Sequence, residues 1–193
     1  MILFVEKPAE RIVPPSPLTL KSGFADPSRE PLVIPFSGVY WFMRAPARVP
    51  PVTSLIQHGS PDNLFYRSAD RRPLVMEAHQ HLGRQISLAC CRAIEVDILN
   101  VDNYPDSVFV EALAVDTSGG YPKRSLGIAT VASTEFKLSG ERSPKVETLP
   151  YQIQSSLLGS FDEITVRFHL SDTRNTRSAR MSIQRFTLRP RGA

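Results

Sequence analysis

The chain has 193 residues, of which 41% are hydrophobic and 22% charged, and its formal net charge is +4. This is the composition of an ordinary folded protein, and the length leaves room for one domain of about 150 residues and little for a second. No apolar run approaches the roughly 18 residues that span a bilayer, and the apolar start is too short for a signal-peptide core. The sequence therefore predicts neither a membrane span nor a targeting segment in this chain.

The first 36 residues are rich in proline. Proline removes a backbone donor and pushes the preceding residue out of the helical region, so neither helix nor sheet is expected here. We predict a disordered leader over residues 1–36, with Leu32–Ile34 able to lie against the domain that follows, residues 37–192. The prolines are Pro8, Pro14, Pro15, Pro17, Pro27, Pro31 and Pro35.

From Gly38 onward, short runs of β-forming residues alternate with turn residues. Alternation of period two is clearest around Ile94–Ile98 and Ile164–Leu170, and a phase slip near the end predicts a β-bulge at Gln184–Arg185. Beyond these runs we expect only a short helical turn near Ser155–Leu158. The predicted strands are Val39–Met43, Asn63–Ser68, Leu74–His79, Gln85–Leu88, Ala93–Asn100, Ser107–Asp116, Leu126–Ala132, Glu163–Leu170 and Ala179–Arg189. Many short strands at near-regular spacing predict an all-β sandwich or barrel, of which we expect the two-sheet β-sandwich.

The two cysteines of the chain are neighbours, Cys90 and Cys91. Adjacent cysteines bridge only through a strained eight-membered ring, so a disulfide framework of the secreted kind is excluded. The favoured interpretation is a pair of buried, small apolar side chains at the start of a strand.

The chain is mildly basic, with Arg more frequent than Lys. Arg suits an anionic partner because its planar guanidinium binds carboxylate and phosphate through two hydrogen bonds. No helical recognition motif and no basic-aromatic RNA motif accompanies the charge, so nucleic acid is not expected as a partner.

Several short motifs carry a family resemblance over residues 36–192. They are Gly38–Phe42, Arg71–Leu74, Met76–Gln80, Cys90-Cys91, Phe161–Glu163 and Arg189–Gly192. With them the chain resembles an uncharacterised bacterial family of jelly-roll proteins, and its strand order is more distantly similar to galactose-binding-like modules. The resemblance implies a jelly roll that binds sugars or other surface ligands without chemistry. It also implies that relatives carry a membrane segment upstream of the proline-rich stretch. If such a segment is missing from this chain, the expected location is the cell envelope; otherwise it is the cytoplasm.

Aromatic residues make one candidate ligand site, because an exposed aromatic side chain can stack on a sugar ring. Tyr40, Trp41 and Phe42 form that platform. The favoured alternative places Trp41 in the core, since it shares the alternation of Val39 and Met43.

Glu77, His79 and His81 are spaced so that an unbroken strand would present all three on one face. Two histidines and a carboxylate are the donors that hold zinc or iron, and the pattern is similar to that of cupins. The carboxylate precedes the pair, however, and His169 is the one remote partner, so histidines without a metal are the favoured interpretation.

Oxygen donors gather around one predicted hairpin. Calcium binds six to eight such oxygens, and we take Asp102 and Asp106 as its candidate ligands. The favoured alternative is that Asp and Asn are simply turn residues, and no cofactor is the first expectation. The donors are Asp97, Asn100, Asp102, Asn103, Asp106 and Asp116.

Glu95 and Asp97 are expected to point outward from one strand, with Glu111 on its neighbour. Paired carboxylates carry out glycoside hydrolysis, but acidic residues that face water are much commoner. No nucleophile elbow and no phosphate loop is present. The first hypothesis is therefore a non-catalytic module that recognises carbohydrate or a protein at the cell envelope. The alternatives are a glycan-active enzyme and a structural appendage of a larger assembly.

Overall fold

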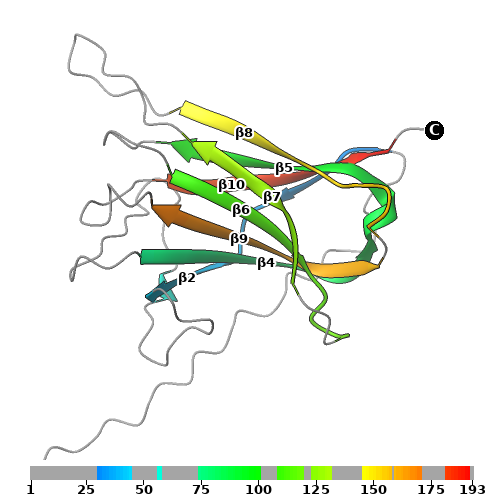
Figure 1. Ribbon diagram of the computed structural model, residues 1–193, viewed down its shortest axis with the longest axis horizontal. Helices are drawn as coiled ribbons and strands as arrows, with labels where there is room; N and C mark the ends of the chain where they lie inside the picture. The colour runs from blue at the N-terminus through cyan, green and yellow to red at the C-terminus, as the bar shows by residue number, and fades with distance from the viewer. Residues whose placement is uncertain are drawn as a thin grey trace, which may run out of the picture.

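The computed structural model describes residues 30–44, 56–57, 74–100, 108–119, 123–131, 145–157, 159–170 and 181–191. These residues form two packed antiparallel sheets (Figure 1), one of four strands in the order β1-β10-β5-β8 and one of six in the order β3-β2-β4-β9-β6-β7. The predicted all-β two-sheet sandwich is confirmed. Its strands are β1 (Leu32–Pro35), β2 (Val39–Arg44), β3 (Ile56–Gln57), β4 (Leu74–Ser87), β5 (Cys91–Asn100), β6 (Val108–Val115), β7 (Arg124–Val131), β8 (Lys145–Gln152), β9 (Ser160–Leu170) and β10 (Met181–Pro190).

The core lies between the two sheets and is built by strand alternation. Ile94, Val96 and Ile98 on β5 are fully buried, and so are Val166 and Phe168 on β9. Because successive side chains of a strand point to opposite faces, each of these strands turns its other set of side chains to the outside of the sandwich. No helix in the described ranges is long and apolar enough to cross a membrane.

The predicted β-bulge in the last strand is confirmed. The pairing of β10 with β5 shifts register between Ile183 and Arg185. One extra residue on β10 lets Ile183 and Phe186 both face the core, although they are three residues apart. The change of phase in the apolar alternation of the sequence is thus explained by the bulge.

Strand β1 lies inside the segment for which no sheet was expected. It pairs with β10 from Leu32 to Pro35 and buries Leu32 and Ile34. Pro35 is tolerated because β1 is an edge strand, which needs donors on one side only. The expectation that Leu32–Ile34 can lie against the domain is therefore confirmed, and the exclusion of a strand here is wrong. Residues 1–29 lie outside the described part of the chain.

Two further strands differ from the expectation. The predicted strands Leu74–His79 and Gln85–Leu88 are one strand, β4, whose pairing with β9 is irregular between His81 and Ile86. Strand β8 was not predicted; it contains Pro150, which is allowed there because β8 is an edge strand of the four-stranded sheet. The predicted strand Asn63–Ser68 lies outside the described residues.

Local turns also differ from the expectation. Over the described residues 154–157 the chain makes a turn closed by a 3.0 Å hydrogen bond from Leu157 N to Gln154 O, and these residues form no helix. The helical turn of the described chain is the 3-10 segment η2 (Leu88–Cys90), which the Ser87 side chain caps by accepting from the Ala89 N–H.

Cys90 and Cys91 form a disulfide, which the favoured interpretation of two small apolar side chains did not include. The bond lies where the chain leaves η2 and enters β5. At this change of backbone direction the two side chains can meet, whereas within a regular strand they would point to opposite faces. Cys91 is fully buried and Cys90 is partly exposed.

Candidate functional site

The outer surface of the six-stranded sheet carries a dense set of polar side chains. We call it the six-strand face and define it by residues whose alternation turns them away from the core. They are Glu77 and His79 on β4, Glu163, Thr165 and Arg167 on β9, Glu111 on β6, and Phe109 and Ile128 on β6 and β7. Strand register aligns Glu77, Arg167 and Glu111 in one row across three strands. The sheet therefore brings together charges from three separate parts of the sequence.

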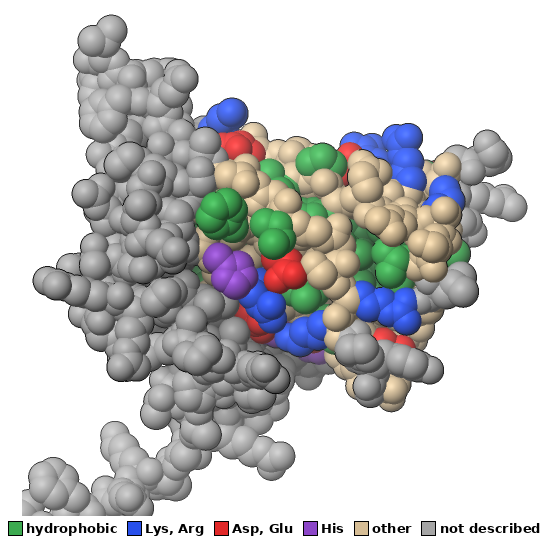
Figure 2. Space-filling model, viewed as in Figure 1, with side chains coloured by type: hydrophobic (Ala, Val, Ile, Leu, Met, Phe, Trp, Pro, Cys, Tyr) green, Lys and Arg blue, Asp and Glu red, His purple; other side chains and the backbone are tan. Residues whose placement is uncertain are grey.

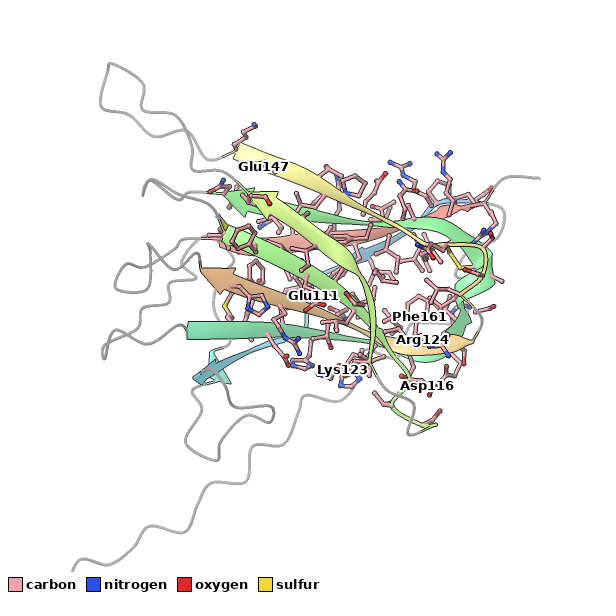
Figure 3. The ribbon with its side chains drawn as sticks, viewed as in Figure 1. Glu111, Asp116, Lys123, Arg124, Glu147 and Phe161 are labelled. Atoms are coloured by element: carbon pink, nitrogen blue, oxygen red, sulfur yellow. A yellow bond between two sulfur atoms is a disulfide. The ribbon has the colours of Figure 1, made fainter. Side chains whose placement is uncertain are left out.

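Arg167 links the two carboxylates of that row. Its Nη2 and Nε lie 2.6 and 2.7 Å from Glu77 Oε1, and its Nη1 lies 3.1 Å from Glu111 Oε2. Lys123 Nζ adds a contact of 3.4 Å to Glu77 Oε2, and the Ser125 hydroxyl donates to Glu111 Oε1 at 2.7 Å. Figure 3 shows Glu111 on β6 and Lys123 just before β7. The guanidinium is held in one orientation by these two partners.

Glu77 is buried, and burial alone raises the pKa of its carboxyl group. The hydrogen bond with His79 and the nearby charges of Lys123 and Arg167 outweigh burial and lower the pKa of Glu77 to about 2. Glu77 is therefore a permanent anion at neutral pH.

His79 lies between two carboxylates. Its Nδ1 is 2.9 Å from Glu163 Oε1 and its Nε2 is 3.3 Å from Glu77 Oε2. Burial lowers the pKa of His79, but the hydrogen bonds with Glu163 and Glu77 raise it above the usual value overall.

The space beside the His79 carbonyl is taken by Gly38, where a Cβ would collide with the oxygen. Glycine at this position thus allows the chain to approach β4 next to His79.

Glu163 completes the cluster. The Thr165 hydroxyl donates to Glu163 Oε1 at 2.8 Å, and His81 Nε2 lies 3.2 Å from Glu163 Oε2. Burial raises the pKa of Glu163, yet the hydrogen bond with His79 and its charge lower it overall. Both buried carboxylates of the cluster are therefore ionised at neutral pH.

Apolar side chains stand beside the charged row and are open to solvent. Phe109 is 39% exposed and Ile128 66% exposed. Phe109 pairs with His169 on β9, and Ile128 pairs with Glu111. Burial and the charge of Arg167 lower the pKa of His169, so its ring is neutral at pH 7. Figure 2 shows hydrophobic, acidic, basic and histidine side chains gathered side by side on the face over β6, β7 and β9.

The predicted metal set is brought together in part. Glu77, His79 and His81 share one face of β4 as expected, but Glu77 is bound by Arg167 and Lys123, and both histidines contact Glu163. Within the described ranges no group of three or more His, Cys, Asp or Glu side chains is arranged to hold a metal ion. Ion pairs occupy the donor atoms that a metal would need.

Tyr40 does not belong to a stacking platform. It is 4% exposed and lies in the core, where its ring packs against Phe36 at a centroid distance of 5.0 Å. The backbone of Trp41 and Phe42 lies in β2, in register with Glu77 and Met76. Their side chains, like Asp102 and Asp106, are outside what the structure describes, so these parts of the prediction stay predictions.

The predicted carboxylate group does not assemble. Glu95 and Asp97 lie on β5 in the four-stranded sheet and Glu111 lies on β6 in the other sheet, so β5 and β6 are not neighbours. Glu95 pairs with Arg189 at 2.9 Å and Asp97 with Arg185 at 2.6 Å. The sequence missed this because consecutive strands were taken to pair, whereas here they lie in different sheets.

The predicted calcium donors are also dispersed where they are described. Asn100 donates to Glu147 at 2.9 Å, and Asp97 is bound by Arg185. Asp116 lies at the far end of β6 from the predicted loop and accepts from Ser118 and Gly119 within its own turn. Asp97, Asn100 and Asp116 therefore do not form one site.

Comparison with known proteins gives similarity in structure only. No family model matches the chain, and no curated protein matches it. Among solved structures, a CBM27-1 from Caldicellulosiruptor saccharolyticus in complex with mannohexaose is similar over 86% of this chain and 100% of its own, with 13% identity and a TM-score of 0.49.

Two other carbohydrate-binding modules are similar at 11% identity. A CBM28 specific for non-crystalline cellulose covers 88% of this chain and 87% of its own, with a TM-score of 0.38. A CBM4 covers 60% and 66%, with a TM-score of 0.31. At such identities and TM-scores no functional residue is transferred from them to this chain.

Proposed function

We propose that the chain is a non-catalytic module that binds an uncharged polysaccharide on the six-strand face. The observation that carries the proposal is the exposure of Phe109 and Ile128 directly beside the Glu111–Arg167 pair. A sugar ring has an apolar side that stacks on an aromatic group and a rim of hydroxyls that needs donors and acceptors. Both kinds of partner lie next to each other here.

The charged row is suited to hydroxyl groups because it is oriented before any ligand arrives. Arg167 is held by Glu77 and Glu111, and Glu111 also accepts from Ser125. Groups that are already fixed lose little conformational entropy on binding. The Glu111 carboxylate, whose side chain is 15% exposed, can still accept, and the Arg167 guanidinium, 27% exposed, can still donate.

Charge balance on this face favours a neutral ligand. Three carboxylates, from Glu77, Glu111 and Glu163, lie close to the cations Arg167 and Lys123 and to His79, whose pKa is raised. Among these described groups, charges of the two signs largely offset each other, which does not favour an anionic or a cationic chain. A polysaccharide with hydroxyls as its polar groups matches this surface.

Binding is favoured over hydrolysis by the state of the carboxylates. Glycoside cleavage needs a general acid that is protonated at the working pH, and its pKa is accordingly raised. The pKa of Glu77 and that of Glu163 are both lowered. These two groups are therefore poor acids, and their fixed negative charge serves hydrogen bonding instead.

Electrophoresis through gels that contain polysaccharide tests the proposal. Mannan and a soluble β-glucan are the neutral probes and polygalacturonate is the acidic one, each with and without calcium. We expect a neutral polysaccharide to retard the protein. Phe109→Ala should weaken the affinity derived from this retardation by about tenfold. The control Val33→Ala, which alters an exposed side chain of the other sheet, should leave the affinity unchanged. Equal migration of all three proteins with every probe would reject the proposal. The envelope location, a protein partner and calcium stay predictions.

A further inference from the structure

The disulfide between Cys90 and Cys91 lies at a junction of three chain segments. The Cys90 carbonyl accepts from the Arg191 backbone N–H at 3.3 Å, and the Cys91 carbonyl accepts from Arg191 Nη2 at 3.1 Å. Both carbonyls of the disulfide-bonded pair thus hold the same residue, which directly follows β10.

The Arg191 guanidinium ties in a third segment. Its Nη2 also lies 3.3 Å from the carbonyl oxygen of Ile153, just after β8, and the Ile153 N–H donates to Arg92 O at 2.8 Å. We call Arg191 and the carbonyls of Cys90, Cys91 and Ile153 the Arg191 clamp. The clamp joins the start of β5 to the ends of β8 and β10, all in the four-stranded sheet.

The disulfide constrains this clamp through covalent geometry. The bond closes a small ring that contains the peptide group between the two cysteines. Because the Cys90 carbonyl belongs to that peptide group, it cannot rotate freely while the ring is closed. The ring also restricts rotation about the N–Cα bond of Cys91, which sets the position of the Cys91 carbonyl group. Opening the ring restores rotation about the backbone bonds on both sides of the peptide, so the direction of the Cys90 carbonyl and the position of the Cys91 carbonyl are released.

We propose that Cys90–Cys91 is a reversible redox site whose reduction opens the Arg191 clamp and loosens the end of β10. The reductant is a dithiol. Its thiolate attacks the Cys90 sulfur, the partly exposed one of the pair, and the S–S bond breaks with the electron pair going to the Cys91 sulfur, which takes up a proton. The second thiol of the reductant then displaces Cys90, which leaves as a thiolate and is protonated. The protein gains two hydrogens, and the reductant becomes a cyclic disulfide.

The covalent state and the clamp are measured separately. Intact mass after alkylation counts the thiols, and amide hydrogen exchange reports the hydrogen bonds of Arg191 and Ile153. We expect dithiothreitol to produce two thiols and to speed exchange of these two amides by about tenfold or more. Amides in the centre of β10, from Phe186 to Leu188, should be unchanged, and reoxidation should restore slow exchange.

Two variants sharpen the experiment. Arg191→Ala removes the guanidinium contacts and leaves the disulfide. In this variant the Ile153 amide should exchange fast in the oxidised protein, and reduction should increase its exchange rate only slightly. The double variant Cys90→Ser/Cys91→Ser should show the same exchange rates as the reduced wild-type protein. If the double variant does not fold, the comparison of oxidised and reduced wild type is the test. Two thiols with unchanged exchange at Arg191 and Ile153, or a disulfide that resists the reductant in the folded protein, would overturn the proposal.

Discussion

The Tyr40 hydroxyl accepts a 2.9 Å hydrogen bond from the backbone N–H of Ile183, across the interior of the sandwich. Tyr40 lies on β2 in the six-stranded sheet, and Ile183 lies at the bulge of β10 in the four-stranded sheet. A bulge disrupts the ladder between strands, so a backbone donor there needs another partner. The tyrosine supplies that partner, and Tyr151 makes the reverse link by donating to Val110 O at 2.8 Å.

Tyr40→Phe should destabilise the protein by about 1–3 kcal/mol, because it leaves a buried N–H of Ile183 without its acceptor. Tyr151→Phe is the matched control. It removes a donor from a carbonyl that has two lone pairs, so we expect a smaller loss of about 0.5–1.5 kcal/mol. Urea unfolding of the three proteins measures the difference, and equal losses would mean that the bulge does not depend on Tyr40.

Ile34→Ala should reduce the free energy of unfolding by about 2–5 kcal/mol, because Ile34 is 2% exposed and its loss leaves a cavity in the core. Its neighbour Val33 is 45% exposed, so Val33→Ala should change stability by no more than about 0.5 kcal/mol. Thermal unfolding provides the measurement. Similar effects at both positions would show that β1 does not pack as described.

Glu77 should make the protein sensitive to acid. Its pKa in the folded protein, about 2, is below the ordinary value of 4.5 for a glutamate side chain. The stability that this shift contributes is therefore complete above about pH 4.5 and is lost as the pH falls towards 2. In Glu77→Gln the decline over this range should be shallower, while stability at neutral pH should fall because Arg167 loses a partner.

Urea unfolding from pH 2 to neutral pH follows this loss. Glu95→Gln is the control, since it breaks the more exposed pair with Arg189 on the other sheet and should cost only about 0–1 kcal/mol at neutral pH. An unchanged acid decline in Glu77→Gln would show that other groups cause it.

The core could be predicted from the sequence because buried positions of a strand recur at every second residue and are occupied by apolar side chains. The alternation of Ile94, Val96 and Ile98 and the phase slip at Gln184–Arg185 both have their counterparts in the structure. Strand β1 was missed because proline was taken to exclude a sheet from the leader, whereas Pro35 is excluded only from the interior of a sheet, and the sequence does not say which strands are edges.

The candidate site was less accessible to sequence reasoning. The outward alternation of Glu77 and His79 was visible, as was that of Thr165 and Arg167, but which strands pair is a property of the whole sheet. Arg167 meets Glu77 and Glu111 only because β9 lies between β4 and β6. The disulfide was not expected because adjacent cysteines close a strained eight-membered ring, and the sequence did not show that the chain turns at η2 just before β5.

The most direct test of the proposed binding face is an NMR titration with the neutral oligosaccharide whose polymer retards the protein most. The account predicts chemical-shift changes concentrated at Phe109, Glu111, Ile128 and Arg167, with Glu95, Arg185 and the rest of the outer face of the four-stranded sheet unaffected. Shifts centred on Glu95 and Arg185 would place binding on the other sheet, and no shifts with any such ligand would mean that the six-strand face does not bind sugar.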